Sequence, residues 1–397
     1  MEWMMGYTEG TGTRDLRIDF MRGVVMLILI IVHIEIFSWF NFIAWERIGL
    51  ISGAEGFVVL SGYILGQVHK RINENSGFKA SSMRLLERSV QLYVINIGIV
   101  ALILVLSMLP LLDLEVIKTF KNWGNGQVYQ LFPHQESSWH QSASNVFLLR
   151  SSPHQIQILG LYCSLLLLTP IAIWLFNHGK AKWVCFTCVV LYIYNLSSPS
   201  RVTAAQFEYA FPLLSWQVLY IAGLTIGFHK DAIGRFFDAK KYNALVAFSA
   251  VFTLVFIFVA WNSPNPAFPD AVKLTWITSD TFYQLHHQYF DKNKLGILRL
   301  FNYACFLVFF YWCLTRFWQP ISRTLGWFFI PLGQASLYVF IMHLVFVVLV
   351  EAITDFSNVK PTYDTANIWQ NTLWHGLSLL GLWLMVKKEF LFNYVPR

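Results

Sequence analysis

The chain has 397 residues, of which 56% are hydrophobic, 17% are aromatic and only 13% are charged. This composition excludes an ordinary soluble globular protein, in which about a quarter of the residues are charged. The net charge of +7 does not indicate a nucleic-acid partner. About two thirds of the 29 Lys and Arg residues fall in segments that would face the cytoplasm if the N-terminus stays inside. The excess of Lys and Arg over Asp and Glu is that of a membrane protein with positive-inside topology, and it predicts no binding to nucleic acid.

Apolar segments of spanning length recur along the whole chain. They predict an all-α, polytopic membrane bundle of about ten transmembrane helices, with both termini in the cytoplasm. In this topology two long polar loops, 113–154 and 262–296, lie outside, and the whole chain, 1–397, forms one domain within the lipid bilayer. The predicted helices lie near 20–42, 53–68, 89–112, 155–176, 183–197, 211–229, 243–261, 297–315, 325–350 and 369–386.

The first of these helices starts in a charged segment and carries a histidine deep inside. Arg22 is followed by ten residues without a polar side chain, and these end on His33. The two residues return to within roughly 20° of the same helix face and lie about 16 Å apart along the axis. Ionisable groups at membrane depth are costly and usually face a protein interior or a water-filled cavity where they function. We therefore predict that His33 is catalytic, the alternative being a core histidine satisfied by one hydrogen bond. We expect Arg17 and Arg22 near the cytoplasmic surface to contact cofactor phosphates, although Arg22 is also within reach of Asp19 on its own helix.

The second helix carries a carboxylate, Glu55, in the run GAEGFVVLSGYILG. An unpaired carboxylate in hydrocarbon should neutralise or find a partner, and His33 or Arg22 on the neighbouring helix is the natural candidate.

The basic segment after this helix contains Arg84 and Arg88, four residues apart at the inner start of the third helix. Guanidinium groups in this arrangement suit the phosphates of an acyl carrier such as coenzyme A. The alternative is that both residues only anchor the topology.

The outer segments contain aromatic residues, histidines and neutral hydrogen-bonding side chains. Such residues suit a carbohydrate, although they also form interfacial belts. Lys and Arg residues also cluster near the eighth helix, in a segment predicted to lie outside, although most Lys and Arg residues are expected in the cytoplasm. This cluster indicates either an anionic or polyhydroxyl ligand or a solvated loop. The histidines lack the tight spacing of metal ligands, so no metal is predicted. The candidate substrate-binding residues here are His154, Gln157, Trp216, Gln217, Lys292 and Arg299.

The ninth helix, WFFIPLGQASLYVFIMHLVFVVLV, holds a second deep polar stripe. Ser336 and His343 are seven residues apart and share a face, with Gln334 about one turn away. Polar groups at this depth should face the bundle interior. His343 is a further candidate catalytic residue. Ser336 is a candidate for substrate binding.

Six segments together carry a resemblance that covers nearly the whole chain in order. They are RDLRIDFMRG…H, FVVLSGY, HQIQILGLYCSLLLLTP, WQVLYIAGLTIG, DKNKLGILRL and LGQASLYVFIMH. The sequence resembles the OpgC proteins, membrane enzymes that add succinyl groups to osmoregulated periplasmic glucans. More distantly, Arg22 and His33 followed by FVVLSGY are similar to the signature of the acyltransferase-3 membrane enzymes, whose arginine and histidine are implicated in acyl-coenzyme A use. The segment RLLER departs from that broader family, because it lacks the flanking basic residues and the proline.

The resemblance implies an O-acyltransferase of the bacterial inner membrane. It would move an acyl group, succinyl or alternatively acetyl, from cytoplasmic acyl-coenzyme A to hydroxyls of a periplasmic glucan or another envelope glycan. His33 would act as general base or would itself accept the acyl group, and either Glu35 or Glu55 would orient its imidazole and stabilise the charged form. The developing oxyanion would accept hydrogen bonds from Gln334, Ser336 and Tyr338. The competing interpretation is a multi-pass transporter of a small anion or sugar, in which His33, Glu55 and His343 relay protons. A purely structural subunit would leave the buried charges without a purpose.

Overall fold

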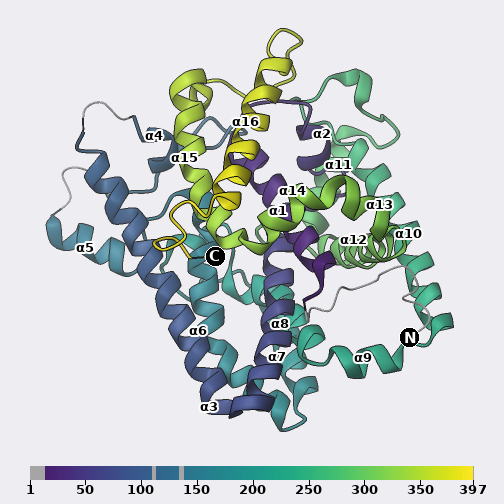
Figure 1. Cartoon of the computed structure of the whole chain (residues 1–397). Helices are drawn as coiled ribbons and strands as arrows, with labels where there is room; N and C mark the ends of the chain where they lie inside the picture. Colours follow the sequence, from purple (N-terminus) through teal and green to yellow (C-terminus); the bar gives the residue numbers. More distant parts are fainter. Residues whose placement is uncertain (1–13, 110–112, 134–137, 397) are drawn as a thin grey trace. The chain divides into compact units, whose positions relative to one another are not determined.

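The computed structural model describes residues 14–109, 113–133 and 138–396 (Figure 1). These residues are helical apart from loops and one short hairpin, which confirms the predicted all-α class. Residues 1–13 and 397, which belong to the termini expected in the cytoplasm, lie outside the described part.

The chain divides into two compact units. The first consists of Met1–Phe57 and Asp231–Arg397, and the second of Val58–Lys230. The first unit contains α1 (Leu16–His33), α2 (Asn41–Ala44), α10 (Ala239–Trp261), the 3-10 helix η4 (Asp270–Val272), α11 (Ser279–Leu285), the π-helix η5 (His286–Phe290), α12 (Ile297–Arg316), α13 (Trp318–Ile321), the π-helix η6 (Ser322–Gly326), α14 (Trp327–Gln334), α15 (Ser336–Thr354), the 3-10 helix η7 (Phe356–Asn358) and α16 (Ile368–Lys387), and α9 (Lys230–Phe236) starts at its boundary.

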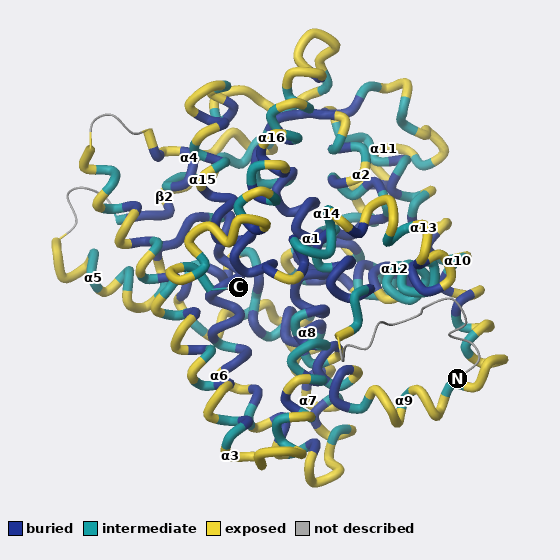
Figure 2. The backbone as a smooth tube through the Cα atoms, viewed as in Figure 1, coloured by how far each residue is buried: buried dark blue, intermediate teal, exposed yellow. Residues whose placement is uncertain are grey.

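The helix that carries His33 is α1, and it is buried over most of its length (Figure 2). Asp15 caps its N-terminus by accepting a hydrogen bond from the backbone N–H of Arg17. The helix ends at His33, because Ile34 takes an extended conformation. The predicted helix near 20–42 was therefore too long, and His33 is the last helical residue before a turn.

Two glycines let α1 and α14 pack backbone against backbone (Figure 1). Gly23 on α1 faces the backbone of Phe329, and Gly333 on α14 faces the backbone of Asp19. A Cβ atom at either position would overlap the opposing main chain. Close approach at small residues is the usual way in which membrane helices gain packing contacts.

The predicted single helix near 325–350 is two helices, α14 and α15, separated at Ala335. Pro331 lies inside α14 and weakens its hydrogen-bond ladder, since proline has no backbone N–H. The break places Ser336 at the first position of α15.

The second unit contains most of α3 (Gly53–Leu106), the longest helix of the described chain. The predicted span 53–68, the basic segment after it and residues 89–106 of the next predicted span all lie in this helix, with one non-helical residue, Gly77, at φ +80°. The other elements of this unit are α4 (Glu115–Lys118), β1 (Thr119–Lys121), β2 (Val128–Gln130), α5 (Trp139–Phe147), the 3-10 helix η2 (His154–Ile156), α6 (Ile158–Asn177), α7 (Ala181–Ser197), the 3-10 helix η3 (Gln206–Tyr209) and α8 (Leu213–Phe228). β1 and β2 form an antiparallel hairpin.

Within the described residues, 5 helices are long and apolar enough to cross a membrane: α3, η2 with α6, α10, α12 and α15. α7 and α8 are apolar but shorter. α1 is not among the 5, because its 18 residues include Arg17, Asp19 and Arg22. The expected total of about ten spans stays a prediction.

Candidate active site

Two histidines from the two predicted polar stripes meet in the first unit. Nδ1 of His33, at the end of α1, lies 2.9 Å from Nε2 of His343 on α15. The two rings stack with their centroids 4.9 Å apart and an angle of 27° between their planes. His343 is 1% exposed and His33 is half-buried. Phe340 borders both rings and itself stacks on Phe57.

A backbone carbonyl decides which nitrogens of this pair carry protons. Nδ1 of His343 is hydrogen-bonded to the carbonyl oxygen of Phe340. A carbonyl oxygen only accepts, so Nδ1 of His343 is the donor and, in the neutral ring, its Nε2 holds a lone pair. That lone pair must accept from Nδ1–H of His33. In the neutral pair, Nε2 of His33 is therefore the basic nitrogen.

At the other end of α1, Arg22 and Asp19 form a polar cluster with the start of α15. Arg22 donates from Nη2 to Oγ of Ser336 at 2.5 Å, and its Nη1 lies 3.8 Å from Oδ1 of Asp19. Asp19 is 2% exposed and also accepts two hydrogen bonds from Arg14, at 2.5 and 2.8 Å. Gln334 lies at the edge of this cluster, 3.5 Å from Asp19. The Arg22 side chain remains 20% exposed.

These two polar contacts join the same helices in the same order. Arg22 meets Ser336 and, about 16 Å further along α1, His33 meets His343. The two helices therefore run in the same direction, and each contact joins one polar residue of α1 to one polar residue of α15. The interpretation of two matching polar stripes agrees with this geometry.

The structure gives Glu55 a different partner from the one expected. Glu55 is ion-paired with Nε of Arg299 on α12, and it accepts hydrogen bonds from the backbone and the hydroxyl of Ser52 at 3.0 and 2.5 Å. Glu55 and Arg299 are both 0% exposed. The expectation that Glu55 pairs with His33 or Arg22 was wrong, because the oppositely charged partner comes from a helix almost 250 residues away in sequence.

Arg299 was expected in an outer basic cluster, and it lies inside the protein. Its Nη1 donates to Glu46 at 2.8 Å and to the carbonyl of Phe290 at 3.0 Å. Burial raises the pKa of Glu46, but Arg299 and His286 more than offset this and lower it to about 2. Lys292 borders the same ion pairs. Its pKa is lowered by burial.

Three other predicted residues of the first unit have contacts that define their positions. Arg17 is 3% exposed and is held by Asp15 at 2.7 Å and by Thr315 at 2.8 Å, and its contact with cofactor phosphates stays a prediction. Tyr338 donates to the carbonyl of Phe390 at 2.6 Å, so its hydroxyl proton is already committed. Glu35 follows the end of α1 and lines a pocket, described below.

The remaining candidates lie in the second unit, and their predicted roles stay predictions. Trp216 is 0% exposed and packs edge-on against Phe211, and Gln217 donates to the carbonyl of Cys188 at 2.8 Å. Both sets of contacts are those of packed core residues. The other candidates in this unit are Arg84, which is exposed, Arg88, which donates to Gln91, His154, which packs against Phe120, and Gln157, which is buried.

In the described residues, no group of three or more His, Cys, Asp or Glu side chains is arranged to hold a metal ion. The site is thus built from an imidazole pair and a guanidinium. This combination suits acid–base chemistry beside an anionic ligand.

Comparison with known proteins identifies the family of the chain. The family model described as OpgC protein matches residues 14–388, nearly the whole sequence. No curated protein matches the chain, and neither does any solved structure. The family implies an acyltransferase, and the apolar helices agree with a membrane protein. The chain belongs to the OpgC protein family.

Proposed function

We propose that the protein is an O-acyltransferase of the bacterial inner membrane. It transfers succinyl from cytoplasmic succinyl-coenzyme A to hydroxyls of a periplasmic glucan. Membership of the OpgC family supports the reaction class. The observation that carries the proposal is the chain from the Phe340 carbonyl through His343 to His33, because it leaves the basic nitrogen on a half-buried residue.

In this mechanism His33 is the general base. Its Nε2 takes the proton of a glucan hydroxyl while that oxygen bonds to the carbonyl carbon of the thioester. The C–S bond then breaks, and the departing thiolate of coenzyme A takes the proton from His33. His343 accepts a hydrogen bond from Nδ1–H of His33 and so holds the ring of His33, which leaves Nε2 of His33 for the reaction.

A second route uses the same atom as a nucleophile. Nε2 of His33 attacks the carbonyl carbon of the thioester, the C–S bond breaks, and the departing thiolate of coenzyme A takes the proton that the acyl-imidazolium loses. The acyl-imidazole then passes its acyl group to the glucan hydroxyl, whose proton returns to His33. The two routes differ in whether an acylated protein forms when succinyl-coenzyme A is supplied without glucan.

Arg22 is the residue that we assign to the donor. Its contacts with Ser336 and Asp19 fix the direction of the guanidinium, and its side chain is partly exposed. Planar guanidinium forks bind phosphate through paired hydrogen bonds. A donor with its phosphates at Arg22 must extend about 16 Å along α1 to bring a thioester to His33. Acyl-coenzyme A has a long flexible arm between these two groups. Arg84 and Arg88 are further candidates for the phosphates.

The test uses the full chain reconstituted in lipid vesicles. We expect free coenzyme A thiol to appear only when succinyl-coenzyme A and a glucan are both present, and the glucan to gain succinyl groups by mass spectrometry. If the coenzyme A thiol is released with acetyl-coenzyme A and glucan but not with succinyl-coenzyme A and glucan, the transferred group is acetyl. Glucan or succinate crossing the vesicle membrane without any coenzyme A ester, and without acylation, would contradict the enzyme and favour the transporter.

A further inference from the structure

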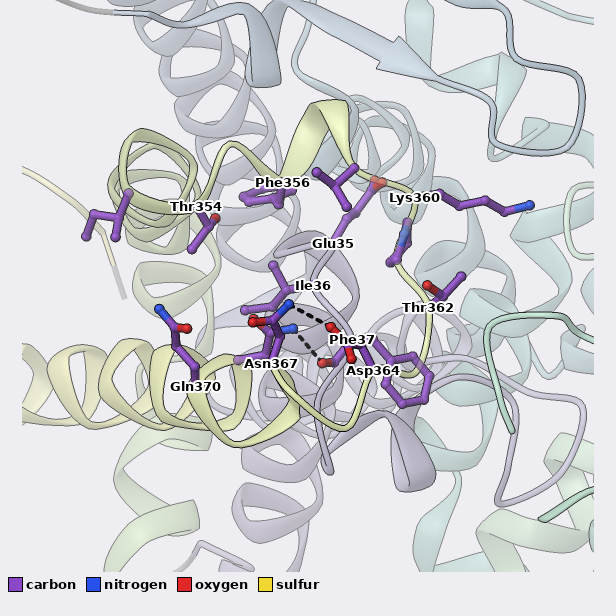
Figure 3. A pocket seen from close by; sticks show the side chains of 14 residues that line it. Glu35, Ile36, Phe37, Thr354, Phe356, Lys360, Thr362, Asp364, Asn367 and Gln370 are labelled. Atoms are coloured by element: carbon purple, nitrogen blue, oxygen red, sulfur yellow. Dashed lines mark hydrogen bonds between the residues drawn. The ribbon is translucent and has the colours of Figure 1, made fainter. Parts of the chain in front are cut away.

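A polar pocket of about 350 Å³ opens in the first unit directly after the end of α1 (Figure 3). Its walls come from three places: the segment after His33, the C-terminal end of α15 with the loop that follows, and the first turn of α16. None of the residues predicted above to bind substrate lines it. Its volume is at the small end of the range for ligand pockets, about 300–1,000 Å³.

The wall contributed by the segment after His33 is rigidly held. His375 on α16 is 0% exposed, its Nε2 donates to the carbonyl of Ile34, and its Nδ1 is hydrogen-bonded to Oγ of Ser38 at 2.8 Å. Asn371 donates to the carbonyl of Phe37 at 2.8 Å. A pocket wall that is fixed in this way does not have to be ordered when a ligand binds.

The lining has the chemistry of a site for a neutral polyhydroxyl ligand. The lining contains hydroxyl, amide and carboxylate groups, so donors and acceptors are both available to sugar hydroxyls. The charged lining residues are Glu35, Asp364 and Lys360. Two carboxylates against one ammonium disfavour an anion. Asp364 is held in place, since it accepts from the backbone of Ala366 and from Asn367.

Aromatic rings continue from the pocket to the surface. Phe37 in the lining lies 6.0 Å from the ring of Tyr363, and Tyr363 lies 6.4 Å from Trp39. Trp39 lies 5.7 Å from Trp369, and these two indoles are 41% and 70% exposed. Exposed indoles offer flat apolar faces with a polar edge, which suit the faces of sugar rings.

The pocket is close to the proposed base. Glu35 is two residues from His33, so their Cα atoms are at most ~7 Å apart. The pocket also lies at the ends of α1 and α15 that are remote from Arg22. If Arg22 faces the cytoplasm, this is the side from which an outer acceptor arrives.

We propose that this pocket is the acceptor subsite, which binds a short stretch of a neutral glucan and directs one of its hydroxyls to Nε2 of His33. The proposal rests on the acyltransferase function proposed above. Glu35, Asn367 and Gln370 bind the sugar hydroxyls, and the indoles of Trp39 and Trp369 carry the next sugar rings.

The experiment uses the full chain in detergent micelles and β-linked glucose disaccharides (sophorose, laminaribiose and cellobiose) as probes. Binding is measured by calorimetry, and the rate of acyl transfer is measured separately. Thr362→Trp fills the pocket with an indole. Thr365→Trp is its matched control, because Thr365 is an exposed threonine of the same loop that does not line the pocket.

We expect Thr362→Trp to weaken disaccharide binding, and to raise the KM for glucan, by about tenfold or more, with the KM for succinyl-coenzyme A unchanged. Thr365→Trp should match the wild type. Gln370→Ala replaces an exposed lining residue and should cause a smaller loss, of several-fold, without a change in folding.

Three results would overturn the subsite: no disaccharide bound by the wild type, equal effects of both tryptophan variants, or displacement of the disaccharide by millimolar succinate. Failure of the proposed function gives a different pattern. Disaccharide binding would then still respond to Thr362→Trp, while the wild type would transfer no acyl group.

Discussion

Replacement of Arg299 by methionine tests the buried ion pairs of the first unit. The variant keeps a long side chain but leaves Glu55 without its cation in a position that is 0% exposed. Breaking a buried pair by removing one partner costs about 3–5 kcal/mol, because the other charge stays in a medium of low polarity. Hydrogen bonds from Ser52 to Glu55 remain, so we expect the lower half of this range.

Glu55→Gln is the matched control, and the two changes should not be equivalent. Without the Glu55 carboxylate, Arg299 still has Glu46 at 2.8 Å and the Phe290 carbonyl at 3.0 Å. We therefore expect Glu55→Gln to cost only about 1–2 kcal/mol. The double variant should be more stable than the sum of the two single losses, because the unpaired carboxylate is gone.

Denaturant titration of the full chain in micelles, followed by tryptophan fluorescence, measures these free energies of unfolding. A stable Arg299→Met variant, or one less damaged than Glu55→Gln, would refute the reasoning. Full stability with a specific loss of glucan acylation would instead return Arg299 to the substrate-binding role that the sequence suggested.

Three further outcomes are expected. Arg22→Lys keeps the charge but loses the planar fork, so the KM for succinyl-coenzyme A should rise several-fold with the fold intact, and an unchanged KM would make Arg22 an anchor. Gly333→Ala should lower the yield of folded protein and its unfolding temperature, because the new Cβ overlaps the backbone of Asp19, and a normal yield would contradict that packing. Glu46 has its pKa lowered from 4.5 to about 2. The stability that it contributes is therefore present above pH 4.5 and is lost as the pH falls towards 2. In Glu46→Gln the melting temperature should depend less on pH in this acid range. If it falls with pH as steeply as in the wild type, the assignment to Glu46 is wrong.

Periodicity and charge predicted much of the helical framework. The apolar segments near 155–176, 183–197, 211–229 and 297–315 correspond closely to α6, α7, α8 and α12. Helix ends were less predictable. α1 ends at His33 although apolar residues continue, because tertiary contacts of Ile34 and Ser38 with His375 hold the next segment in a turn.

Within the site, the sequence identified side chains that face one another but not all of their pairings. His33, His343, Arg22 and Ser336 were selected because polar residues rarely lie in apolar helices without a purpose. The pairing of Glu55 with a distant arginine depends on how α12 packs, and no spacing along the chain encodes it. The break at Ala335 had a signal that was missed, since proline and glycine precede it within four residues.

The acceptor pocket could not be found from motifs. Its lining combines single residues from three separate segments, and each is an ordinary loop or helix-end residue by itself. The only sequence signal was the position of Glu35, two residues after the predicted catalytic histidine.

The most direct test of the central claim is acyl transfer by His33→Gln. Glutamine keeps a hydrogen-bonding side chain that can still reach His343, but it cannot take a proton near neutral pH. General base catalysis contributes about a hundredfold to ten-thousandfold in rate. We expect the variant to insert at normal levels, to bind succinyl-coenzyme A, and to leave the glucan without succinyl groups by mass spectrometry, whereas His178→Gln, at an exposed histidine of the second unit, stays active. Substantial acylation of the glucan by normally expressed His33→Gln would contradict the assignment of His33 as the catalytic base.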